Sequence, residues 1–120
     1  MKVTVAATQM ACGVDRDANI GNAERLIREA ARRGANVILI QELFESPYFC
    51  KDHLAKHFEL ATPIAENPAI RRLSKVAAEL GVVLPLSVFE RGHNAYFNTL
   101  VMVDADGRTL GIYRKSHIPE

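Results

Sequence analysis

Glu42 is the first candidate for a residue that does acid–base chemistry. It follows the aliphatic run "ILIQ" (residues 38–41), which is typical of a buried strand. The carboxyl end of a parallel strand is where α/β proteins build ligand sites. Shielding from water favours the neutral form of a carboxyl group there, which makes it a better general base. The alternative is a glutamate that points into solvent from a loop.

Lys115 is the second such residue, in the segment "GIYRKSHIPE" at residues 111–120. A lysine at a strand end is usually a solvated charge that blocks pairing with another chain. Facing a shielded Glu42, its ammonium group could instead balance the carboxylate and donate hydrogen bonds to a developing oxyanion. Sequence spacing alone leaves both interpretations open.

The two cysteines, Cys12 and Cys50, are weak candidates for a nucleophile. A reactive thiol needs a nearby base or positive charge, and the local sequence of neither cysteine supplies one clearly. We therefore interpret both as packed small hydrophobes. A thiol enzyme that uses Cys50 with Glu42 nearby remains a weaker alternative.

The sequence predicts neither a metal site nor a cofactor site. Its four histidines lack metal-ligand spacing, and its seven glycines form no phosphate-binding loop.

The first half of the chain predicts a βαβ unit that would position Glu42. Residues 2–9 alternate polar with apolar side chains, residues 15–34 have helical spacing, and residues 36–41 form the aliphatic strand, which we expect to be buried on both faces. Two strands joined by such a helix are parallel, with a right-handed crossover. The predicted buried stripe of the helix is Ile20, Ala23, Ile27 and Ala30, and the predicted N-cap is Asp15 or Asp17, with Gly34 after the end.

The second half predicts a loop, a helix and three hairpin-linked strands. The loop at residues 43–66 is rich in aromatic side chains, which argues for function over disorder. A helix then begins at Asn67-Pro68, with Ile70, Leu73, Ala77 and Leu80 on its buried face, and ends at Gly81. The predicted strands are residues 82–90, 95–104 and 109–116, so the fold class is α/β with a mixed sheet.

Composition limits the class of protein. The chain has 120 residues, 48% hydrophobic and 24% charged, as expected of one soluble globular domain. The net charge of +1 argues against a nucleic-acid partner, and no apolar run reaches the roughly 20 residues of a membrane span. The N-terminus lacks the pattern of a secretory signal, so we expect a cytoplasmic protein with reduced cysteines.

Four segments together resemble the nitrilase superfamily of carbon–nitrogen hydrolases, and most of all its N-carbamoylputrescine amidase branch. They are "VAATQM", "ILIQELFESPYFC", "NAYFNTLVMVDADG" and "GIYRKSHIPE". The similarity runs across essentially all 120 residues. It implies an α-β-β-α sandwich, of which residues 1–120 would be the N-terminal part of a single domain, cut before the nucleophile.

The resemblance also implies a Glu-Lys-Cys catalytic set. Glu42 matches the general base and Lys115 the catalytic lysine. The nucleophilic cysteine of the family lies further downstream, and neither cysteine of this chain matches it. A supporting second glutamate also follows the lysine, and we do not assign it to Glu120.

The implied reaction is hydrolysis of N-carbamoylputrescine to putrescine, carbon dioxide and ammonia, as a step of polyamine biosynthesis. Tyr48 and Phe49 would wall the pocket, although packing alone could explain these rings. The resemblance implies a small ureido or amide substrate, no cofactor, and a homo-oligomer at full length, with the 120 residues inactive alone. The alternatives are a β-ureidopropionase-like or ω-amidase-like enzyme, or a non-catalytic α/β binding or interaction module.

Overall fold

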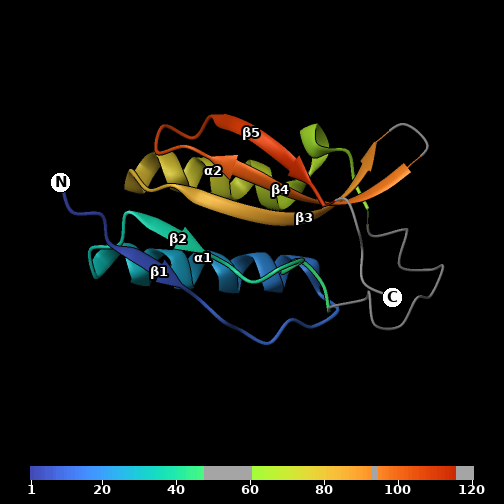
Figure 1. Cartoon of the computed structure of the whole chain (residues 1–120). Helices are drawn as coiled ribbons and strands as arrows, with labels where there is room; N and C mark the ends of the chain where they lie inside the picture. Colours follow the sequence, from blue (N-terminus) through green and yellow to red (C-terminus); the bar gives the residue numbers. More distant parts are fainter. Residues whose placement is uncertain (48–60, 93–94, 116–120) are drawn as a thin grey trace.

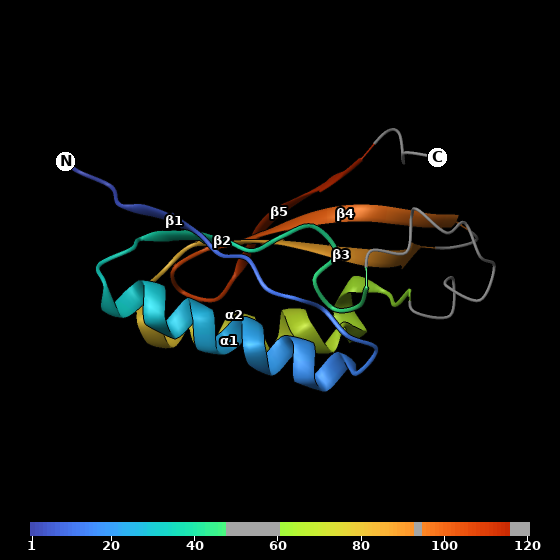
Figure 2. The same ribbon diagram turned by 90° about the horizontal axis from the view of Figure 1, so that it is seen from below.

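The structure is a computed structural model that describes residues 1–47, 61–92 and 95–115. In chain order its elements are β1 (Val5–Ala7), α1 (Arg16–Arg32), β2 (Val37–Leu39), the 3₁₀ helix η3 (Ile64–Glu66), α2 (Pro68–Leu80), β3 (Leu84–Gly92), β4 (Ala95–Val103) and β5 (Thr109–Arg114). The strands form one layer, and α1 and α2 lie side by side against one face of it (Figures 1 and 2). The predicted mixed α/β architecture is confirmed.

The βαβ unit forms as predicted. Strand β1 pairs in parallel with β2, and Val5 is opposite Val37 in the register. Helix α1 begins after Asp15, whose carboxylate accepts a hydrogen bond from the Ala18 N–H at 3.1 Å. Just after the helix, Gly34 has a φ of 96°, a conformation that glycine adopts without steric cost. Most of the predicted stripe is buried, namely Ile20, Ala23 and Ile27, whereas Ala30 is half-buried.

Helix α2 also begins and ends at its predicted residues. Asn67 caps it by accepting a hydrogen bond from the Ile70 N–H at 2.9 Å, and Pro68 takes the first helical position. Gly81 ends it in the left-handed conformation, at a φ of 68°. Ile70, Leu73 and Ala77 are buried against the strands as expected, and Leu80 is half-buried.

The strands form a two-stranded parallel sheet, β1-β2, and a three-stranded antiparallel sheet in the order β3-β4-β5. The two sheets adjoin through a parallel bridge between Val37 and Val83, where the Ile38 N–H donates to the Val83 carbonyl at 3.0 Å. Strands β2, β3 and β5 therefore run in the same direction, with β4 opposed. The carboxyl ends of β2, β3 and β5 therefore meet at one edge of the strand layer.

The expectation that the strand at residues 36–41 is buried on both faces is wrong for the described residues. Ile38 and Ile40 are buried in the core under the helices, but Leu39 is 48% exposed. Successive side chains of a strand point to opposite faces, and the helices cover only one of these faces (Figure 2). None of the helices in the described part of the chain is long and apolar enough to cross a membrane.

Candidate active site

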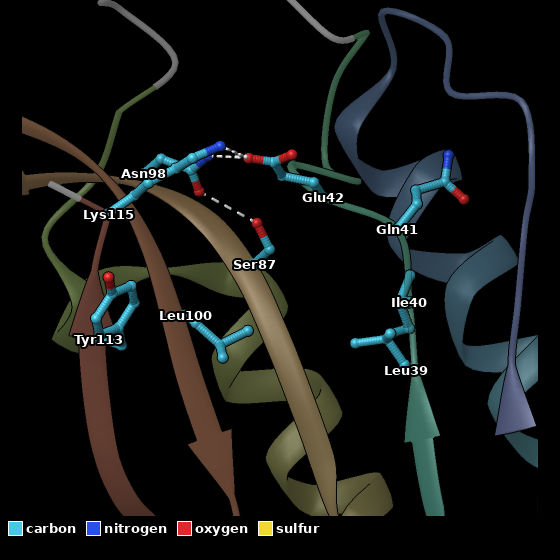
Figure 3. Close-up of a pocket in the computed structure, with 9 residues that line it drawn as sticks. All are labelled: Leu39, Ile40, Gln41, Glu42, Ser87, Asn98, Leu100, Tyr113 and Lys115. Carbon is cyan, nitrogen blue, oxygen red and sulfur yellow. Dashed lines mark hydrogen bonds and ion pairs between the residues drawn. The ribbon is translucent and has the colours of Figure 1, made fainter. Parts of the chain in front are cut away.

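Glu42 and Lys115 lie together at the carboxyl-end edge of the strands. Lys115 Nζ is 3.2 Å from Glu42 Oε1, which makes an ion pair (Figure 3). Glu42 stands three residues beyond the end of β2, and Lys115 directly follows β5. Because β2 and β5 run in the same direction, their ends bring the two charged groups to the same place.

Asn98, on β4, contacts both members of the pair. Its side-chain Nδ2 donates a hydrogen bond to Glu42 Oε1, and its backbone carbonyl accepts one from the Lys115 N–H at 2.9 Å. Asn98 is only 5% exposed, so its position is set by the packing of the sheet. The sequence alone did not point to Asn98.

Ser87, on β3, joins this network to the turn that carries Glu42. The Ser87 hydroxyl accepts a hydrogen bond from the Leu43 N–H at 3.0 Å and donates one to Asn98 Oδ1 at 3.3 Å. The signal that could have found both residues is a polar side chain within an otherwise apolar strand, since such a group needs a partner when buried.

Leu43 has a backbone conformation that is unusual for its residue type. Its φ is 53°, which makes it the one non-glycine residue with a positive φ in the described ranges. A residue other than glycine is strained in this region, and such strain collects at functional sites. The turn at Leu43 carries the chain out of the aliphatic strand just after Glu42, and the Leu43 side chain is 2% exposed.

A pocket of about 460 Å³ opens beside the ion pair (Figure 3). Its polar end holds Glu42, Lys115, Asn98 and Ser87, and its other lining residues are Leu39, Ile40, Gln41, Leu100 and Tyr113. In Figure 3 the Gln41 side chain points away from the pair. Its amide bonds to the backbone of Met10, with Oε1 accepting from the N–H at 2.8 Å. The pocket therefore combines an apolar wall with one charged corner.

The described residues leave the ion pair half-exposed, at 40% for the Glu42 side chain and 39% for Lys115. The sequence predicts a carboxylate shielded from water, and the described part of the chain does not supply that shielding. Tyr48 and Phe49, the predicted pocket wall, lie outside the described residues, as do Cys50, Glu120 and all four histidines.

Cys12 is half-buried and is not poised as a nucleophile. Burial raises the pKa of the Cys12 thiol, which favours its unreactive neutral form. Its Sγ accepts a hydrogen bond from Gln41 Nε2 at 3.3 Å. Over residues 1–47, 61–92 and 95–115, no cluster of three or more histidine, cysteine, aspartate or glutamate side chains could hold a metal ion.

A second ion pair anchors the end of β5 from the opposite face. Glu90 is 5% exposed and accepts two hydrogen bonds from the Arg114 guanidinium, at 2.8 and 2.7 Å, and one from the Thr99 hydroxyl at 2.7 Å. The Arg114 bond, and secondarily that from Thr99, lowers the pKa of Glu90. Because neighbouring residues of a strand alternate in direction, Arg114 is held on the helix side while Lys115 faces the pocket.

A carboxylate and an ammonium group lie together at the carboxyl ends of strands, beside a pocket, which is where α/β proteins place ligand and active sites, so the geometry indicates the class of enzymes and small-molecule-binding proteins. Comparison with known proteins narrows this class. The sequence model of the carbon-nitrogen hydrolase family matches residues 4–120, and the chain belongs to that family.

Curated relatives are similar in sequence to this chain along nearly its whole length. The chain is 52% identical over 119 residues to the N-carbamoylputrescine amidase of Oryza sativa subsp. japonica, an alignment that covers 99% of this chain and 40% of that protein. It is 41% identical over 118 residues to a citrullinase of Francisella tularensis, covering 98% of this chain and 41% of that protein. The chain thus spans about two fifths of the length of these relatives.

Solved structures share the fold. The carbon-nitrogen hydrolase from Helicobacter pylori G27 superimposes with a TM-score of 0.89 at 30% identity, covering 98% of this chain and 41% of that one. Nit3 of Saccharomyces cerevisiae superimposes with a TM-score of 0.82 at 22% identity, covering 96% and 43%. The predicted nitrilase-like fold and the membership of the nitrilase superfamily are therefore confirmed.

Proposed function

We propose that these 120 residues form the N-terminal part of a single carbon–nitrogen hydrolase domain, and that the full-length enzyme hydrolyses N-carbamoylputrescine to putrescine, carbon dioxide and ammonia. The observation that carries the proposal is the ion pair between Glu42 and Lys115, at 3.2 Å beside an open pocket. The identity of 52% to an N-carbamoylputrescine amidase supports the choice of substrate.

In this mechanism Glu42 acts as the general base and Lys115 as the oxyanion donor. Glu42 takes the proton from a cysteine thiol, and the thiolate attacks the ureido carbonyl carbon. Lys115 stabilises the negative charge that develops on the carbonyl oxygen. The carbon–nitrogen bond to the terminal nitrogen breaks, and Glu42 returns the proton to the leaving ammonia.

The second half of the reaction regenerates the thiol. A water molecule, deprotonated by Glu42, attacks the S-carbamoyl carbon, and the carbon–sulfur bond breaks. The released carbamic acid loses carbon dioxide to leave putrescine. No step needs a metal or an organic cofactor. The nucleophile is not assigned to Cys12, because burial raises the pKa of its thiol, and we propose that it is supplied downstream in the full-length enzyme.

The pocket lining supports a ureido group at the end of a short methylene chain. Leu39, Leu100 and Tyr113 offer apolar surface for methylene groups, and the charged corner suits the polar ureido end. Citrulline also carries a terminal ureido group on methylene groups, and a citrullinase is 41% identical to the chain. We therefore propose a terminal ureido group as the shared requirement, and N-carbamoylputrescine as the preferred substrate.

The remaining alternatives have less support. An ω-amidase of Arabidopsis thaliana is 28% identical over 118 residues, below both ureido-directed relatives. A non-catalytic binding module would not require Glu42, Asn98 and Lys115 to converge beside a pocket. We also propose that the full-length enzyme is a cytoplasmic homo-oligomer, which sedimentation and cell fractionation would test.

The test is ammonia release by the full-length enzyme from N-carbamoylputrescine, citrulline, β-ureidopropionate and an ω-amide. We expect the highest kcat/KM for N-carbamoylputrescine, and a loss of at least about 10³-fold in Glu42→Gln because the base is removed. The matched control is Glu24→Gln, which removes another ion-paired carboxylate, bound to Arg28 and Arg72 on the helices. Wild-type turnover by a folded Glu42→Gln enzyme would refute the assignment of the base.

A further inference from the structure

The two oxygens of Glu42 have different surroundings. Oε1 accepts hydrogen bonds from both Lys115 Nζ and Asn98 Nδ2 (Figure 3). Among the described residues, none donates a hydrogen bond to Oε2. Within the described part of the chain, Oε1 is therefore engaged by two donors, and no donor contacts Oε2.

We propose that Asn98 is a positioning residue for the base: together with Lys115 it occupies Oε1 of Glu42, so that Oε2 takes the proton. This inference rests on the proposed role of Glu42 in catalysis and deepens it. The sequence pattern that points to Glu42 and Lys115 assigns nothing to Asn98.

Ser87 determines which end of the Asn98 amide faces Glu42. A side-chain amide has a donor end and an acceptor end, and only the donor end can bond a carboxylate. The Ser87 hydroxyl accepts the Leu43 N–H at 3.0 Å, so its own proton is directed to Asn98 Oδ1 at 3.3 Å. With its oxygen held by Ser87, the amide presents Nδ2 to the carboxylate.

Burial makes this arrangement rigid. Asn98 is 5% exposed and Ser87 8%, and they lie on the neighbouring strands β4 and β3. Lys115, at 39% exposed, has a flexible four-carbon side chain and could not by itself hold Glu42 in one orientation. Asn98 also accepts the Lys115 backbone N–H, so a single buried residue fixes both members of the pair.

The inference predicts a specific change in pH dependence. In Asn98→Asp, a second carboxylate replaces the donor beside Glu42, and a like charge favours the neutral form of its neighbour. We expect the acidic limb of the kcat/KM profile of the full-length enzyme to move upward by about one pH unit. In Asn98→Leu, which lacks the donor, we expect kcat to fall about 10²-fold because orientation is lost, with KM within about threefold of wild type.

Two further variants separate positioning from general stability. Ser87→Ala leaves Asn98 in place but no longer holds its amide oxygen, so Nδ2 is presented to Glu42 for less of the time. We therefore expect the acidic limb of the kcat/KM profile to move upward, as in Asn98→Asp, but by a smaller amount. This variant keeps the inference testable if the Asn98 variants fold poorly. Thr99→Val is the matched control, since it removes a buried hydrogen bond from the next residue of β4, on the other face of the sheet. Its acidic limb should stay in place.

A second measurement does not depend on turnover. In the same proteins, the side-chain carboxyl carbon of Glu42 can be followed by ¹³C NMR during a pH titration and assigned by its absence in Glu42→Gln. We expect Asn98→Asp and Ser87→Ala to move the titration midpoint upward. Folded variants that leave both the midpoint and the acidic limb unchanged would overturn the inference. A shifted midpoint in an enzyme that releases no ammonia from ureido compounds would support the positioning and refute the proposed function.

Discussion

Lys115 Nζ lies 3.2 Å from Glu42 Oε1, although the two residues are 73 positions apart in the sequence. Both side chains are about 40% exposed. An ion pair this exposed contributes only about 0–1 kcal/mol to stability, because water competes for both charges and two long side chains must be ordered. We therefore expect the stability of the protein to depend little on this contact, whereas the proposed mechanism requires it.

Replacing Lys115 by methionine should separate these two contributions. Methionine keeps most of the side-chain length but removes the ammonium group. We expect kcat/KM for ammonia release by the full-length enzyme to fall by about 10²–10³-fold, since the proposed donor to the oxyanion is lost. The free energy of unfolding should change by less than about 1 kcal/mol.

Lys115→Arg is the informative companion variant, because it retains the charge and changes the geometry. A planar guanidinium does not reproduce the point donor of an ammonium group, so we expect Lys115→Arg to be nearly as slow as Lys115→Met. Full activity in Lys115→Arg would show that charge alone is sufficient, and full activity in Lys115→Met would remove the lysine from the mechanism.

The elements of the fold were predictable from the sequence because their signals are local. The asparagine cap and proline at the start of α2, and the glycine that ends it, lie within a few residues of the backbone groups they satisfy. The three hairpin-linked strands follow from short turns, such as Asp106-Gly107. The burial of Leu39 was mispredicted because an aliphatic run does not reveal which face of a strand layer is covered.

The arrangement around Glu42 was less predictable because it depends on register. Ser87 and Asn98 bond each other only because the β3–β4 pairing places Ser87 opposite Leu100, which is two residues from Asn98 in β4 and on the same face of the sheet. The positive φ of Leu43 has no local signal, since leucine does not favour that conformation. Family resemblance pointed to Glu42 and Lys115, whereas the hydrogen bonds made by Ser87 and Asn98 could be found only from coordinates.

Glu90 should stabilise the protein at neutral pH and lose this contribution in acid. Its hydrogen bonds from Arg114, and secondarily from Thr99, hold the pKa of Glu90 below its ordinary value of 4.5. A lowered folded-state pKa contributes stability that is present above the unfolded-state value and is lost as the pH falls through the folded-state value. The contribution from this residue should therefore disappear below about pH 4.5.

The variant that tests this is Glu90→Gln, followed by urea unfolding between neutral pH and about pH 3. At neutral pH we expect a loss of about 1–2 kcal/mol, because charge-assisted hydrogen bonds become neutral ones. The difference from wild type should shrink as the pH falls below about 4.5. A difference that stays constant down to pH 3 would show that the Glu90 carboxylate does not change its protonation on unfolding in this range.

Glu45 should show the opposite pH dependence. It is 4% exposed, and its Oε1 has no hydrogen-bond partner among the described residues. Burial raises the pKa of Glu45, although the charge of Arg16 and bonds from Asn67 and the Ala69 backbone act against it. A raised folded-state pKa gives stability that is complete below the unfolded-state value and lost as the pH rises through the folded-state value.

Replacing Glu45 by glutamine removes this titration and keeps the shape. We expect the urea midpoint of Glu45→Gln to approach that of wild type near pH 4.5, the ordinary value for a glutamate, and to exceed it at about pH 8. The reason is that at this higher pH the wild-type protein must bury the ionised Glu45 carboxylate, whereas the variant buries a neutral amide. A variant less stable than wild type at pH 8 would indicate that the ionised carboxylate is favoured by its contacts with Arg16 and Asn67.

Gly107 should be the glycine least tolerant of substitution in the described residues. Its φ is 85°, and a Cβ added to it would lie 2.8 Å from the Ser74 carbonyl oxygen of α2, closer than real Cβ contacts. Gly107→Ala therefore combines backbone strain with a clash against the backbone of a helix, which cannot shift easily.

Gly34 is the matched control, because its φ of 96° also lies in the left-handed region, while the described residues other than its chain neighbours leave the space within 4 Å of the added Cβ empty. We expect Gly34→Ala to cost about 1 kcal/mol and Gly107→Ala at least about 2 kcal/mol more, measured by urea unfolding. Equal losses in the two variants would mean that the turn moves away from α2 without cost, and that this contact does not hold β4 and β5 against the helix.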